Sequence, residues 1–150
     1  MLKEQNNERL IERIIHESVL FAIIIRSEFS SQGINFFTPE SFSQQLAYMR
    51  RKKGYVIEPH VHNKVQREVF NTQEVLFIKS GKVRVDFYDN NKKYLKSSYL
   101  AKGDVILLSS GGHGFFMEEE SEIIEVKQGP YAGDSDKTRF QSDPNLDLKV

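Results

Sequence analysis

Cysteine is absent from the sequence of 150 residues. Its absence excludes a disulfide scaffold and every metal site built on thiolates, so a bound metal ion would need nitrogen and oxygen ligands. Bulky apolar groups are supplied by 11 phenylalanines and 6 tyrosines. A chain of this length is most simply one domain, residues 1–150, with a hydrophobic core of its own.

An excess of either charge is also absent, because 21 basic residues balance 21 acidic residues. Proteins that bind nucleic acids generally carry a basic excess, so we expect no nucleic-acid partner. The longest apolar run, VLFAIII at residues 19–25, is far shorter than the roughly 20 residues of a membrane-spanning helix. The opening MLKEQNNERL lacks the pattern of a signal peptide, and we therefore expect a cytoplasmic protein with no membrane partner.

Residues 1–40 are expected to form an extension of one helix and one strand. Apolar residues at helical spacing between residues 4 and 17 predict a short amphipathic helix. The β-branched run at residues 19–25 is typical of a buried strand. Residues 41–50 fit a strand or a helix, and we favour a strand because no helix stop signal precedes the stretch that follows.

From Glu74 onward the sequence predicts strands separated by turn signals. The six expected strands are EVLFIK, KVRVDFY, KYLKSSYL, DVILL, HGFFM and EIIEVK. Short strands at this regular spacing predict an all-β antiparallel barrel or sandwich, with its core at about residues 41–128. Residues 129–150 show little periodicity, and we expect an irregular tail that packs on the domain in part.

Two of the four histidines, His60 and His62, stand one residue apart in the stretch GYVIEPHVHN. Residues at positions i and i+2 of a strand project from the same face, so these two side chains could converge on one metal ion. A pair of surface histidines on an edge strand is the other interpretation.

The surrounding residues resemble the cupin superfamily, whose first motif reads G-(x)5-H-x-H-(x)3,4-E-(x)6-G. Its second motif carries a glycine, a strand, a Pro-x-Gly turn and a last histidine. The matching positions span residues 54–128 and are Gly54, His60, His62, Glu74, Gly81, Gly103, Gly111 and His113. Four features depart from the family pattern. The 11 residues NKVQREVFNTQ separate His62 from Glu74. The second motif lacks its proline, its spacing to His113 is one residue short, and Met117 stands where Asn is common.

The resemblance implies a double-stranded β-helix, or jelly-roll barrel, with a metal ion held by three histidines and one carboxylate. Its ligands would be His60, His62, Glu74 and His113, with Glu68 as the alternative carboxylate. Such a donor set suits one divalent transition metal ion, Fe, Mn, Ni or Zn. Four protein ligands on an octahedral ion leave two positions for water, substrate or dioxygen.

Five further residues are candidates for binding a substrate. Arg67, in the insert at residues 63–73, offers a planar partner to a carboxylate or a phosphate. Gln66 lies beside it and is a weaker candidate. Phe115 and Met117 share the strand face of the last histidine and would line the pocket or simply pack beside it. Tyr48 precedes the predicted metal-binding strand.

The resemblance implies a metal-dependent enzyme that acts on a small anionic or carbohydrate-like metabolite, either as a dioxygenase or as an isomerase or epimerase. The alternative is a non-catalytic module that binds a small ligand. We also expect a homodimer, because edge strands need protection and residues 19–25 are too apolar for a free arm.

Overall fold

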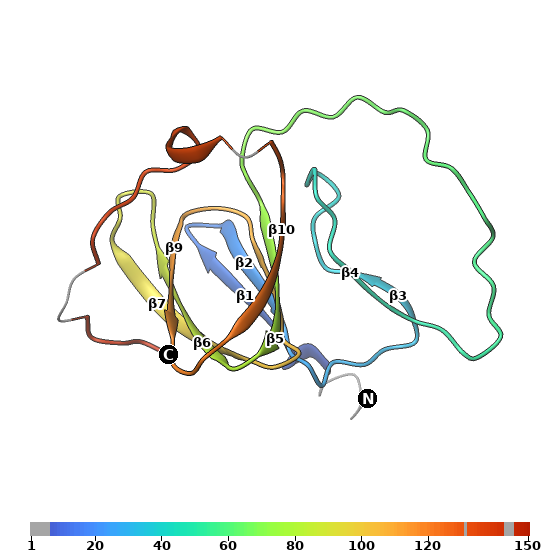
Figure 1. Cartoon of the computed structure of the whole chain (residues 1–150), viewed down its shortest axis with the longest axis horizontal. Helices are drawn as coiled ribbons and strands as arrows, with labels where there is room; N and C mark the ends of the chain where they lie inside the picture. The colour runs from blue at the N-terminus through green and yellow to red at the C-terminus, as the bar shows by residue number, and fades with distance from the viewer. Residues whose placement is uncertain (1–6, 131, 143–145) are drawn as a thin grey trace.

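The structure is a computed structural model that describes residues 7–130, 132–142 and 146–150. From Ile11 onward, these residues form ten strands and one short 3-10 helix, η1 (Gly133–Ser135). The strands make three antiparallel sheets, as Figure 1 shows. No helix within these residues has the length and the apolar character needed to cross a membrane.

A five-stranded sheet and a three-stranded sheet form the body of the molecule. The order in the larger sheet is β1 (Ile11–His16), β2 (Val19–Ile25), β8 (Val105–Leu108), β5 (Glu74–Ser80) and β10 (Glu122–Lys127). The order in the smaller sheet is β7 (Tyr94–Ala101), β6 (Lys82–Tyr88) and β9 (Gly112–Met117). The hairpin β3 (Gly33–Phe36) and β4 (Ala47–Arg50) is the third sheet. The six strands predicted from Glu74 onward are confirmed, and an all-β antiparallel fold with them.

The predicted N-terminal helix is wrong for residues 9–17. Residues 11–16 form β1, which pairs with β2 through a tight turn. Alternation along β1 leaves Ile14 buried and Ile15 58% exposed, while Ile11 packs on the opposite face of the strand from Ile14. Apolar residues on both faces of one strand therefore resemble the apolar spacing of a helix. The part of the prediction on residues 4–6 lies outside the described residues.

The apolar run at residues 19–25 is the buried strand that the sequence predicts. β2 lies between β1 and β8, and residues 21–25 are buried on both faces. The run is therefore covered within its own chain, and it no longer provides a reason to expect a dimer.

One core lies between the two larger sheets. Alternate residues of β6, namely Val83, Val85 and Phe87, face inward and are at most 1% exposed. They pack against the inward residues of the larger sheet, among them Ile24, Leu76, Ile78 and Ile106.

A second core covers the outer face of the larger sheet, beneath the β3–β4 hairpin. Its buried residues are Ile23, Ile25, Phe29, Phe37 and Leu107. Only residues 47–50 of the predicted strand at 41–50 are extended and paired.

A charged network connects the two larger sheets at one end. Arg26, directly after β2, contacts the carboxylates of Glu12 at 2.8 Å and Asp104 at 3.0 Å. Glu12 on β1 also accepts hydrogen bonds from Lys96 and Ser98 on β7, each at 3.0 Å. These contacts span from the larger to the smaller sheet and close this end of the sandwich.

The sandwich is open along its opposite side, and no closed barrel is found in the described residues. In that part of the chain β9 pairs only with β6, and β10 pairs only with β5. The segment before β5, residues 51–73, contains no strand, and residues 51–71 are all exposed. Figure 1 shows this segment as a wide arc away from the sheets.

The C-terminal tail is irregular and packs in part, as predicted. The ring of Phe140 lies edge-on to Tyr88 with a centroid distance of 5.1 Å. The carbonyl of Lys149 accepts a hydrogen bond of 2.6 Å from the N–H of Ser97 on β7. The tail therefore covers the outer face and the free edge of the smaller sheet.

The substitution Glu12→Gln should destabilise the fold at pH 7 and make its stability less sensitive to acid. Burial alone would raise the pKa of Glu12, but hydrogen bonds from Lys96 and Ser98 and the charges of Lys96 and Arg26 outweigh it and hold the pKa below the ordinary 4.5. A carboxylate with a lowered pKa stabilises the fold above its unfolded pKa, and this contribution is lost as the pH falls through the folded value.

Urea denaturation at pH 7 and about pH 3 measures the effect. We expect Glu12→Gln to lose about 1–2 kcal/mol at pH 7 and to lie closer to the wild type at the lower pH. Glu119→Gln, which changes an exposed carboxylate, serves as the control. An equal loss for Glu12→Gln at both pH values would contradict the assignment.

Candidate functional site

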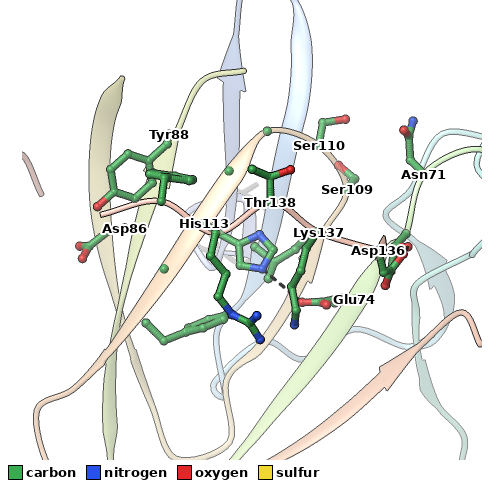
Figure 2. Close-up of a pocket in the computed structure, with 18 of the residues that line it drawn as sticks. Asn71, Glu74, Asp86, Tyr88, Ser109, Ser110, His113, Asp136, Lys137 and Thr138 are labelled. Carbon is green, nitrogen blue, oxygen red and sulfur yellow. Dashed lines mark hydrogen bonds and ion pairs between the residues drawn. The ribbon is translucent and has the colours of Figure 1, made fainter. Parts of the chain in front are cut away.

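A cavity of about 1180 Å³ lies at the open side of the sandwich, around β9. Glu74 of β5, His113 of β9 and Lys127 of β10 line it on the inner side. Residues 135–140 of the tail and the turn before β9 complete its wall. Figure 2 shows His113 and Glu74 facing each other within it, joined by a dashed line.

Strand register brings these side chains together. Glu74 stands opposite both Leu108 of β8 and Lys127 of β10, on the face of β5 that also carries Leu76. His113 stands opposite Phe87 of β6, on the inward face of the smaller sheet. The two sheets therefore each contribute one polar side chain to the same inner space.

Gly111 fixes the point at which β9 begins. Its φ of +70° lies in a region that L side chains rarely adopt, and a Cβ there would collide with the ring of Phe21. The turn can therefore approach β2 closely, and His113 follows two residues later.

The carboxylate of Glu74 and the imidazole of His113 are in contact, with 3.2 Å between His113 Nε2 and Glu74 Oε2. The hydrogen bond from His113 lowers the pKa of Glu74; burial opposes this, and the charges of His113 and Lys127 add to the lowering. Lys127 Nζ lies 3.5 Å from Glu74 Oε1 and 3.0 Å from Glu125 Oε1. The carboxylate of Glu74 is thus ionised and partly buried, in the protonation state that binds a cation.

The structure brings together two of the four predicted metal ligands, Glu74 and His113. It leaves His60 and His62 in the exposed segment 51–73, where no strand forms. Their rings are close to each other, with a centroid distance of 5.2 Å, and His60 Nδ1 lies 2.9 Å from the carbonyl oxygen of Glu58. Within the described part of the chain, no three His, Asp or Glu residues are placed to hold one ion.

The donor chemistry of Glu74 and His113 nevertheless fits a transition metal ion. Imidazole nitrogen and carboxylate oxygen bind such ions at about 2.1 Å, so two neighbouring ligand atoms on one ion are about 3.0–3.4 Å apart. The 3.2 Å between His113 Nε2 and Glu74 Oε2 lies in that range. These residues can therefore provide half of a four-ligand site, and the other donors would have to come from elsewhere in the chain.

The predicted substrate-binding residues are spread over three regions. Arg67, Gln66 and the alternative carboxylate Glu68 lie in the exposed segment. Phe115 lines the cavity, with its ring 5.4 Å from that of His113.

Met117 and Tyr48 do not line the cavity. Met117 shares the inward face of β9 with His113, as predicted, but lies further along the strand and is 47% exposed. Tyr48 packs on Phe29 in the second core, with 5.1 Å between the ring centroids.

Several cavity residues were not predicted from the sequence. Lys127 and Glu125 occupy alternate positions of β10, and two charged residues at this spacing on one face of the strand were the available signal. On the other side of β9, Arg84 donates hydrogen bonds of 2.8 and 3.0 Å to Asp86, a pairing that raises the pKa of Arg84. This pair had no sequence signal beyond its charges.

Comparison with models of known families, with curated proteins and with solved structures found no significant match. The fold is all-β with antiparallel sheets, and these comparisons identify no family.

Proposed function

We propose that the chain is a metal-binding protein of the jelly-roll type, which holds one divalent transition metal ion at the cavity and uses it to bind a small anionic or carbohydrate-like ligand. The contact between Glu74 and His113 carries the proposal. It joins residues of two different sheets at the mouth of a cavity, and its length suits two ligands of one ion. Both residues also fall on the positions of the cupin motifs.

The strand order supports the jelly-roll interpretation. Strands β8, β5 and β10 face strands β6 and β9, and both β9 and β10 have a free edge. The segment with His60 and His62 directly precedes β5 in the chain. A strand paired with β9 would lie about 4.8 Å from it, so inward side chains on that strand would come within reach of His113.

An ion at this position would supply positive charge to the cavity. One carboxylate against a divalent ion leaves a net charge of about +1, which attracts an anionic oxygen. Lys127 adds a cationic group, and Phe115 adds an apolar surface on the same side. A cavity of about 1180 Å³ is large enough for a metabolite.

The first prediction concerns the ion. Isothermal titration with Fe(II), Mn(II), Ni(II) and Zn(II) should give one tight site for at least one of them, and a chelator should lower the melting temperature of the loaded protein. Glu74→Gln and His113→Ala should each weaken binding by at least about tenfold, because each removes a direct ligand.

His16→Ala is the control for the first prediction, because His16 lies on β1 and does not line the cavity. It should bind the ion as the wild type does. Folded Glu74→Gln and His113→Ala proteins that bind as much metal as the wild type would rule out the site.

The second prediction concerns the ligand. A panel of small carboxylates and sugar phosphates should contain at least one compound that binds the metal-loaded protein. Arg67→Ala should weaken its binding about tenfold, the loss of one charge-assisted contact, and should leave the metal content unchanged. Lys64→Ala, a neutralised cation in the same exposed segment, is the matched control. Equal affinities for Arg67→Ala and Lys64→Ala would remove Arg67 from the site.

Turnover distinguishes an enzyme from a binding module. The ligand that binds is incubated with the metal-loaded protein under air and under nitrogen. Consumption of dioxygen would identify an oxygenase, and product formed without it an isomerase or epimerase. Binding without product under both atmospheres would identify a binding module.

A further inference from the structure

The segment at residues 55–70 exposes more apolar surface than a free loop should. Its exposed bulky residues are Tyr55, Val56, Ile57, Val61, Val65, Val69 and Phe70, of which Val61 and Phe70 are nearly 90% exposed. Contiguous apolar surface on a soluble chain generally marks a contact with another surface. This segment therefore lacks its partner.

The backbone of the segment also lacks a partner. Among the described residues, its backbone hydrogen bonds consist of one turn, from the N–H of Tyr55 to the carbonyl of Lys52. The chain around His60 and His62 forms neither a helix nor a turn, and Figure 1 shows it as an open arc. An unpaired segment of this kind can add a strand to a free sheet edge.

The free edge of β9 offers the matching surface. One side of β9 pairs with β6, and its other side has no strand beside it in the described part of the chain. Phe115, Phe116 and Met117 on this strand are 36%, 52% and 47% exposed. A free edge that exposes apolar side chains is a template for pairing with another strand.

The position of the segment favours pairing with a second copy. In Figure 1 the arc passes on the far side of the β3–β4 hairpin, so that the hairpin and β5 separate it from β9 of its own chain. A segment of residues 51–73 spans up to about 75 Å when extended, enough to reach another molecule.

The hairpin provides a second reason. Ile34, Phe36 and Met49 on its outer side are 43%, 60% and 48% exposed. A return of the segment to its own β9 would leave this surface uncovered, whereas the body of a second copy beside the arc would cover it. In a reciprocal exchange around a twofold axis, the same contact pairs the segment of each chain with the free β9 edge of the other.

We propose that residues 55–63 pair with β9 of a second copy of the chain and that two chains exchange this segment reciprocally. Each cavity then receives His60 and His62 from the neighbouring chain, where they meet Glu74 and His113. The last step rests on the proposed metal site, but the strand exchange does not. The two are therefore tested separately.

Cross-linking tests the exchange in a chain that has no cysteine of its own. If His60 and His62 face inward, Val61 faces outward, as Phe116 does on β9. The double variant Val61→Cys, Phe116→Cys is produced with and without 15N, and the two forms are refolded together at low concentration. A short bis-maleimide, which tolerates a small shift in register, then joins the two positions.

Exchange predicts linked 61–116 peptides that carry mixed isotopes, and a covalent dimer on a denaturing gel. Linked peptides of a single isotope composition, in a covalent monomer, would overturn the proposal in favour of pairing within one chain. The absence of a 61–116 link in folded protein would also overturn it. Val61→Cys with Gly114→Cys is a second pair, because a Cβ at Gly114 makes only ordinary contacts. Val61→Cys with Ile15→Cys on the distant strand β1 is the control and should give no link.

Complementation tests the shared site. One chain carries His60→Ala and His62→Ala, and the other carries Glu74→Gln and His113→Ala, so that neither binds the ion alone. Refolded together and purified through two different tags, they should form a heterodimer that holds about one Zn(II), because exchange assembles one complete site. A mixed-isotope cross-link without metal in this heterodimer would overturn the shared site while leaving the exchange intact.

Discussion

The packing of β6 against the larger sheet is the interaction on which the rest of the structure depends. Val83 and Val85 are completely buried against Ile24, Ile78 and Ile106. This layer ends toward β9, where Phe115 and Met117 face the same inner space but remain 36% and 47% exposed. The sandwich is therefore filled on one side and open on the other, and the inner part of the cavity is the unfilled part of this core.

The polar residues of the cavity follow from this difference. Glu74, Glu125 and Lys127 occupy inward positions of β5 and β10, where a closed core would require apolar residues. Charges at such positions are tolerated only when they are paired or reached by water, and these three pair with one another and with His113. The inward positions of these strands are thus apolar within the core and charged where the core ends.

The sequence predicts best those strands whose limits are set by alternation and by flanking turns. The limits of β6 are those expected from KVRVDFY, because alternation and flanking turns define a strand without reference to its neighbours. The helix expected before residue 17 was wrong for β1 because apolar residues on both faces of this strand resemble the spacing of a helix. The resemblance to the cupin motifs led us to expect that Glu74 and His113 lie together, and they are 3.2 Å apart. His60 and His62 lie in a segment where no strand forms; a strand there would need a partner far away in the sequence or in another chain, and no local pattern encodes such a partner.

The two ends of the sandwich differ. One end is closed by ion pairs and the other is open, and the open end is where a ligand or a partner can enter. Arg26 joins Glu12 and Asp104 at one end, so the sheets are held together there by charges that are satisfied within the chain. At the cavity, by contrast, β9 has a free edge and an apolar segment lies exposed. If that segment supplies the missing strand, the edge and the exposed surface are removed by the same contact that completes the metal site. Assembly and ion binding would then stabilise each other, because each favours the state in which the other is possible.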